Sequence, residues 1–206
     1  MKKFIFLLSL FFSFIAGAYA QVNNAKVLTD SYQKGFLTER KDTAYYQNQF
    51  FNALPSNFKS FKSLYGWNED GTRRALSSIQ PYYFFRFFAT RSINEDAMIK
   101  KMTDIAINAT WAPGAINDFQ QGSFQYALSH NKSFIKHLKT LSKKDIVAVW
   151  TFYFDYENPM FRKASYDKMI KEVQKNDKAM IPQVTEGYTK SGKKWAVKYK
   201  GYLKAN

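Results

Sequence analysis

Two carboxylates directly after the longest apolar run of the chain are the clearest candidates for catalysis. Asp155 and Glu157 follow residues 146–154, an apolar stretch broken only by Thr151. If that stretch is a β-strand, the two acidic side chains point to one face, because side chains alternate along a strand. Paired carboxylates serve glycosidases as general acid and nucleophile, so one hypothesis is a glycan hydrolase using Asp155 and Glu157. The alternative is that these residues merely end an apolar element at the surface.

Other catalytic and metal-binding chemistries find no support in the residue types. The chain lacks cysteine, which excludes disulfides, thiol catalysis and cysteine–zinc sites. Its two histidines, His130 and His137, belong to no HxxxH or HExxH pattern, and Asn131 is expected to break the helix between them. No G-x-S-x-G elbow, P-loop or dinucleotide fingerprint occurs. We therefore expect a non-enzymatic protein with no metal site and no cofactor.

Lysines at helical spacing form the first candidate binding surface. Four of them recur at i, i+4, i+7 and i+11 and would share one face if a helix continued through Ser142; they are Lys132, Lys136, Lys139 and Lys143. Lysines at positions 168, 171, 175 and 178 repeat nearly the same spacing. Each row lies opposite an apolar face, so the alternative is the solvated side of an amphipathic helix.

The C-terminal segment, residues 184–206, is the second candidate surface. Trp195, Val197 and Tyr199 alternate there with basic or small residues, after a Ser-Gly turn signal. This alternation predicts a small β-hairpin or, if it stays unpaired, a disordered basic tail. Lysines interleaved with aromatic rings can clamp polyanions or stack on sugars. The candidate contacts are Tyr188, Lys193, Lys194, Trp195, Lys198 and Tyr199.

Residues 1–20 have the pattern of a secretory signal peptide. Two lysines precede an apolar run over residues 4–18, and Ala18 and Ala20 fit the A-x-A cleavage pattern. We expect a mature protein of residues 21–206 that is exported, either to the periplasm or out of the cell. No later stretch is long and apolar enough to span a bilayer.

The chain is strongly basic, with 31 lysine and arginine residues against 16 aspartate and glutamate residues. Removing the two lysines of the leader would leave 29 basic side chains and a net charge of +13. An excess of this size favours contact with an anion. The expected partner is an acidic protein or an envelope polyanion, and nucleic acid is not expected.

Helix signals dominate the rest of the chain. Ser142, with Asp145 three residues later, resembles a capping box, which favours a helix over a strand for residues 146–154, although Val, Trp, Phe and Tyr would also suit a strand. The pattern predicts an all-α fold, a single compact domain of about seven helices over residues 21–183, followed by the hairpin or tail. Further helix signals fall at residues 44–54, 57–65, 82–91, 94–109, 113–128, 132–141 and 165–180.

Together these features predict an exported, soluble, non-enzymatic binding protein. Its most concrete form is an inhibitor or immunity-type protein of the bacterial envelope, which masks an acidic protein through a lysine-bearing face. The alternatives are a protein that binds an envelope polyanion or glycan through residues 184–206, and the glycan hydrolase described above.

Overall fold

The structure, a computed structural model, describes residues 24–76 and 83–205, with side chains up to residue 200. In these ranges every regular element is helical, and the single β feature is an isolated antiparallel bridge between Trp67 and Arg73. The predicted all-α class is therefore confirmed. None of the described helices has a stretch long and apolar enough to cross a lipid bilayer. The proposed leader, residues 1–20, lies outside the described residues.

The chain forms two compact units, and the first ends at Leu54. Its helical segments pack through aromatic rings, with the centroids of Phe36 and Phe50 5.5 Å apart. Gly35 permits this approach, because a Cβ there would lie 2.9 Å from the backbone nitrogen of Gln47. The described elements of this unit are a helix over residues 24–32, the π-helical turn η1 (Gln33–Leu37) and α2 (Thr43–Ala53).

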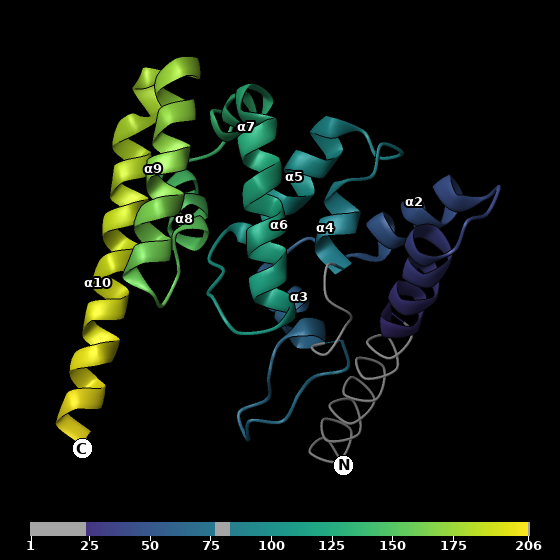
Figure 1. Cartoon of the computed structure of the whole chain (residues 1–206), viewed down its shortest axis with the longest axis horizontal. Helices are drawn as coiled ribbons and strands as arrows, with labels where there is room; N and C mark the ends of the chain where they lie inside the picture. Colours follow the sequence, from purple (N-terminus) through teal and green to yellow (C-terminus); the bar gives the residue numbers. More distant parts are fainter. Residues whose placement is uncertain (1–23, 77–82, 206) are drawn as a thin grey trace, which may run out of the picture. The chain divides into compact units, whose positions relative to one another are not determined.

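The second unit, Pro55–Asn206, contains the remaining helices (Figure 1). Several begin at side-chain caps: Asn57, Asn94 and Ser142 each accept a hydrogen bond from the backbone N–H three residues later. Such bonds satisfy amides that have no partner within a helix. The described elements are α3 (Phe58–Tyr65), α4 (Tyr83–Phe88), α5 (Glu95–Ala106), α6 (Ala115–Ser129), α7 (Asn131–Leu138), α8 (Lys143–Tyr153), α9 (Pro159–Asn176), the 3-10 turn η2 (Lys178–Met180) and α10 (Ile181–Ala205).

Helix α8 is enclosed by other helices of this unit. It packs against α5, α6 and α10, and its apolar residues are buried around most of its circumference. Trp150 is fully buried and meets Phe134 of α7 edge to face, with centroids 5.5 Å apart. The helix expected for residues 146–154 is therefore confirmed, and it is surrounded because a helix that is apolar on all sides cannot face water.

Aromatic rings also hold α3, α4 and α6 together. The ring of Phe119 on α6 lies 4.7 Å from that of Phe61 and 5.2 Å from that of Phe84. Helix α6 approaches α4 closely at Gly122, where a Cβ would lie 2.7 Å from the ring of Phe88. These contacts fix α6 as a central helix of the unit, with α4 on one side of it.

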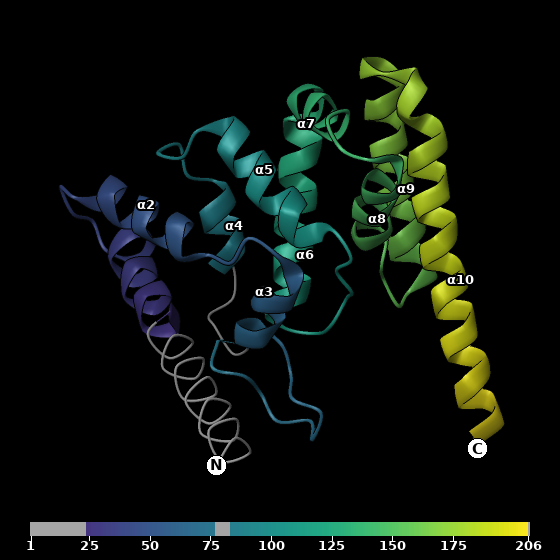
Figure 2. The same ribbon diagram turned by 180° about the vertical axis from the view of Figure 1, so that it is seen from behind.

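The C-terminal segment is a helix, so the expected hairpin or tail is wrong. Figures 1 and 2 both show α10 running beside α8 and α9 as one continuous helix. Its buried positions are Val184, Gly187, Ser191 and Trp195, which fall at i, i+3, i+7 and i+11, the spacing of one helix face. Val197, two residues beyond Trp195, is 72% exposed. Trp195 and Val197 therefore do not share a face, as they would in a strand. Over a few residues, the spacing of a helix resembles the two-residue alternation of a strand.

Candidate functional site

The carboxylate of Asp155 lies buried just beyond the end of α8 and accepts three hydrogen bonds. Asp155 is 1% exposed. Its Oδ1 accepts from the indole Nε1–H of Trp195 at 2.7 Å, and its Oδ2 accepts from the backbone N–H of Trp111 at 2.8 Å and from Lys194 Nζ. A buried carboxylate is stable only when such donors replace its water. Asp155 therefore connects the end of α8 to α10 and to the loop before α6.

The proposed pairing of Asp155 with Glu157 depended on a strand that does not form. Helix α8 ends at Tyr153, and the chain turns immediately afterwards, with the Asp155 N–H donating to the Phe152 carbonyl at 3.0 Å. Glu157 is exposed, whereas Asp155 is buried and already bonded to three donors. The strand that would have turned both carboxylates to one face is absent, and its three hydrogen bonds make Asp155 a structural anchor between segments.

The first lysine row does not lie on one helix. Ser142 caps α8, accepting from the Asp145 N–H at 3.2 Å, so the row is divided between α7 and the start of α8. Lys139 forms an ion pair with Asp177, and Lys143 Nζ lies 4.0 Å from Glu186. These two lysines bind the neighbouring helices α9 and α10. Lys132 and Lys136, the other two members of the row, are exposed on α7.

The candidate contacts in the C-terminal segment divide into structural and exposed residues. Trp195 is 2% exposed and Lys194 binds Asp155, so both belong to the packing of α10. Lys198 Nζ lies 4.4 Å from the centroid of the Trp195 ring. The Tyr188 ring stacks on Tyr166 of α9 at 4.4 Å. In contrast, Lys193 is exposed, whereas Tyr199 is 42% exposed but already donates from its hydroxyl to the Glu157 carbonyl at 3.5 Å.

Helices α9 and α10 form an antiparallel hairpin, residues 159–206, which carries most of the net charge. This hairpin contains twelve lysine and arginine residues and four aspartate and glutamate residues, a net charge of +8 of the chain's +15. On α10 the positions opposite Trp195 include Lys190, Lys193, Val197 and Lys200, all exposed. We call these four residues the outer face of α10. It is a solvent-facing basic surface that a strand model does not predict.

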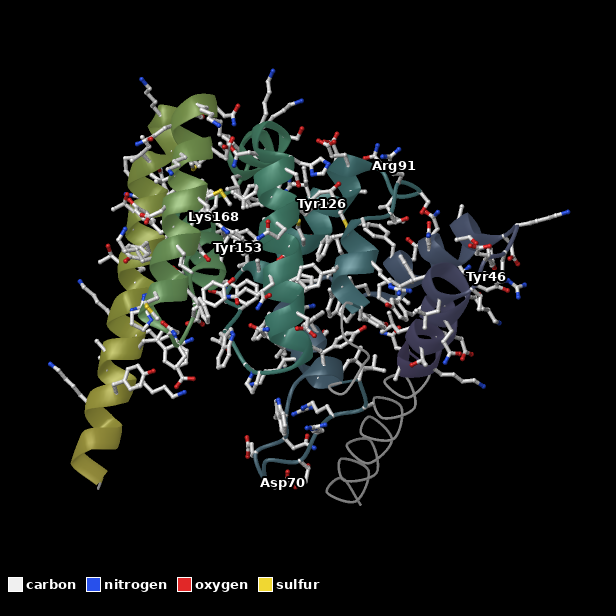
Figure 3. All side chains as sticks on the ribbon, viewed as in Figure 1. Tyr46, Asp70, Arg91, Tyr126, Tyr153 and Lys168 are labelled. Atoms are coloured by element: carbon white, nitrogen blue, oxygen red, sulfur yellow. The ribbon has the colours of Figure 1, made fainter. Side chains whose placement is uncertain are left out.

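A groove runs over α6 in the second unit. It consists of two adjoining hollows of about 880 and 1010 Å³, and both are lined by Phe85, Gln125 and Lys168. Helix α6 supplies residues to both hollows, with α4 on one side and α9 on the other. Figure 3 labels three of the lining residues, which are Tyr126 on α6, Lys168 on α9 and Arg91 in the loop after α4. We call this hollow the α6 groove.

Three side-chain amides from α6 line the groove at a regular spacing. Asn117, Gln121 and Gln125 fall at i, i+4 and i+8, which places them in one row. The Asn117 Oδ1 accepts from the indole Nε1–H of Trp111 at 3.0 Å and from Gln121 Nε2 at 3.2 Å. These bonds fix the first two amides, while Gln125 is exposed. We call these three residues the amide row.

Neither histidine belongs to a metal site in the described part of the chain. No group of three or more His, Asp or Glu side chains is placed there to hold a metal ion. His130 stacks on Tyr126 with centroids 4.0 Å apart, and its Nε2 lies 4.0 Å from a Glu95 oxygen. Burial, with a smaller contribution from the charge of Glu95, raises the pKa of Tyr126 to about 12. The phenol is therefore neutral at physiological pH.

No protein-family model, curated protein or solved structure matches this chain. Its function must therefore be inferred from the geometry of its own residues.

Sequence reasoning missed the α6 groove. A signal was present, because the amide row repeats at four-residue intervals along the helix. The walls could not be anticipated, since they come from α4 and α9, whose positions beside α6 depend on long-range packing. The outer face of α10 was missed for another reason, namely that its residues were assigned the period of a strand.

Proposed function

We propose that this chain is an exported, non-enzymatic protein that binds an acidic partner protein, in the manner of an inhibitor or immunity-type protein of the bacterial envelope. The observation that carries the proposal is the net charge of +8 on the α9–α10 hairpin, combined with the exposure of its lysines from Lys163 to Lys200. A basic surface of this kind speeds association with an acidic surface and disfavours basic competitors. The basic surface is therefore the proposed contact.

The packing of α10 favours a role in contact for its outer face. The apolar side of the helix faces α8, where Val184 and Trp195 are almost fully buried. Lys193 and Lys200 on the opposite side form no ion pair within the described residues and are exposed. Their charges can therefore act on a partner instead of on neighbouring side chains.

Binding of a sugar polymer by the C-terminal aromatic residues is less well supported. Stacking on a sugar needs an accessible ring face. Trp195 is 2% exposed, and Lys198 lies over its ring. The tryptophan that suggested glycan binding is thus part of the protein interior, which favours a protein partner.

The proposal is tested with two charge-reversed baits of equal net charge. One carries Lys190→Glu, Lys193→Glu and Lys200→Glu on the outer face of α10, and the other carries Lys132→Glu, Lys136→Glu and Lys144→Glu on α7 and α8. All six positions are exposed. Each bait, matched in fold by circular dichroism, is used to recover proteins from the native envelope at low and high salt, roughly 50 and 300 mM.

We expect the wild type and the α7–α8 variant to recover the same acidic protein, and the α10 variant to lose it. Recovery by the wild type should fall at least about tenfold at the higher salt concentration, because the attraction is electrostatic. Equal loss with both variants would mean that net charge, and not this face, is responsible. Equal recovery with all three baits, or no specific protein with any of them, would refute the proposal.

A further inference from the structure

The α6 groove has a length and a floor suited to an extended chain. Helix α6 contains 15 residues, which corresponds to about 22 Å at 1.5 Å per residue. An extended polypeptide of about six or seven residues covers that length at roughly 3.3 Å per residue. The two hollows follow one another along α6 and share Gln125. The groove is therefore long enough for an extended peptide of about six or seven residues, whereas a compact pocket would suit a small molecule.

The amide row matches the hydrogen-bonding groups of a peptide backbone. Residues four apart on a helix are separated by about 6 Å along its axis, close to the repeat of roughly 6.6 Å between alternate residues of an extended chain. Each Asn or Gln amide offers both a donor and an acceptor, as a backbone peptide unit does. The Asn117 Oδ1 already accepts hydrogen bonds from Trp111 and Gln121, and its Nδ2 donates to Asp118 at 3.4 Å. Asn117 therefore holds Gln121 in place, and a bound backbone would meet the amides of Gln121 and Gln125.

Exposed apolar residues mark one end of the groove. Phe161 and Tyr199 line it and are 62% and 42% exposed, and Met160, next to Phe161, is 71% exposed. Large apolar side chains left in water are typical of surfaces that a partner covers. This end can therefore take an aromatic or aliphatic side chain from the bound segment.

The uncompensated charges of the groove are mainly positive. One of its carboxylates already has a cationic neighbour, because Glu172 lies 2.7 Å from Lys175 Nζ. Glu95 lies 4.0 Å from the His130 ring. The cations Arg91, Lys168 and Lys171 form no ion pair within the described residues. The carboxylate of Glu157, which lines the groove near Phe161, also forms no ion pair within the described residues. Lys168 borders both hollows, so an acidic side chain at the middle of a bound segment would meet its ammonium group.

We propose that the α6 groove binds an extended, acidic segment of a partner protein, with backbone groups on the amide row, a carboxylate at Lys168 and an apolar side chain at Phe161. This inference rests on the proposed function and identifies the element of the partner that is recognised. The outer face of α10 supplies long-range attraction, whereas the groove supplies the specific contact.

The probe is a phage-displayed library of random 12-residue peptides, selected on the full mature chain. Enriched peptides are synthesised with a fluorescein label, and their affinity is measured by fluorescence anisotropy beside scrambled peptides of the same composition. The groove variants are Gln125→Ala, Phe161→Ala and Lys168→Glu. The matched control for Lys168→Glu is Lys144→Glu, which makes the same charge change at an exposed position outside both the groove and the outer face of α10.

We expect the enriched peptides to combine acidic with apolar residues. Their affinity should fall at least about tenfold with Lys168→Glu and with Gln125→Ala, and it should be unchanged with Lys144→Glu. The inference is overturned if no peptide is enriched, if the groove variants bind like the wild type, or if scrambled peptides bind equally well. A polyuronate that displaces the peptides and shows the same variant dependence would assign the groove to an acidic glycan instead. The α10 variant separates the two proposals. It should lose capture of the envelope protein, as the proposed function requires, and it should still bind the selected peptides, as the groove proposal requires.

Discussion

The indole N–H of Trp195 donates a hydrogen bond of 2.7 Å to the buried carboxylate of Asp155, 40 residues earlier in the chain. This bond joins α10 to the end of α8, and the backbone N–H of Trp111 binds the other carboxylate oxygen at 2.8 Å. The Trp111 and Trp195 rings also meet edge to face, with centroids 5.8 Å apart. One carboxylate therefore organises three segments of the second unit.

Asp155→Ala should destabilise the second unit strongly. The substitution leaves the buried Trp195 N–H and the Trp111 N–H without their acceptor, and each unsatisfied donor costs about 1–3 kcal/mol. We expect the free energy of unfolding to fall by about 2–4 kcal/mol, measured by urea denaturation with tryptophan fluorescence. The matched control is Glu157→Ala, at an exposed position, which should change stability by less than about 0.5 kcal/mol. A similar loss in both variants would show that Asp155 is not the anchor described.

Gly187→Ala should weaken the contact between α8 and α10. A Cβ at this position would lie 2.9 Å from the Thr151 nitrogen and the Trp150 carbonyl carbon, and backbone atoms cannot yield as a flexible side chain does. Overpacking of this kind costs about 1–3 kcal/mol. The control is Gly192→Ala in the same helix, where a Cβ meets only Arg162 Nε at 3.9 Å.

The control variant should gain roughly 0.5–1 kcal/mol, because alanine favours a helix over glycine. Thermal unfolding followed by circular dichroism compares the two variants directly. If Gly187→Ala proved as stable as Gly192→Ala, the close packing of α8 against α10 would be in error.

Local signals predicted the fold class and many helix starts. Ser142 was identified as a cap from its neighbours, and it accepts the expected backbone hydrogen bond. The long apolar run was correctly assigned to a buried helix for the same reason. These features depend on residues a few positions apart, so the sequence alone contains the information.

Features that depend on distant contacts were not predicted. Trp195 and Tyr199 were assigned to a strand because two-residue alternation and helical spacing overlap over a few residues. The structural role of Asp155 was not foreseen, because its three hydrogen-bond donors come from positions 111, 194 and 195. No local pattern relates these positions to Asp155, so its carboxylate was considered for catalysis instead. The α6 groove escaped prediction likewise, since its walls meet only after α4 and α9 have packed.

Export predicts a defined N-terminus for the mature protein. We expect cleavage after Ala20, so that Gln21 becomes the first residue, because Ala18 and Ala20 provide the small side chains required at the cleavage site. Intact-mass measurement and N-terminal sequencing of protein recovered from the envelope fraction check this. Ala20→Arg should leave the leader attached, whereas Ala16→Leu, within the apolar run, should not. A full-length product in the cytoplasm would contradict the exported function.

His137 should make the stability of the second unit depend on pH near neutrality. Burial lowers the pKa of His137 below its ordinary value of 6.5, and this effect exceeds the opposing influence of Asp104; Lys100 lowers the pKa further and Asp96 raises it. Its Nε2 is buried without a hydrogen-bond partner among the described residues. The folded protein therefore prefers neutral His137, whereas the unfolded chain binds a proton at ordinary pH values near 6.5.

The unfolded state thus binds more protons between the lowered pKa and 6.5, and stability rises with pH across that window. The contribution of His137 is complete above pH 6.5 and is lost as the pH falls through the lowered pKa. His137→Gln, which does not titrate, should flatten this dependence in urea denaturation between about pH 5 and 8, while His130→Gln should retain it. If the two variants showed the same slope, protonation of His137 would not be the cause.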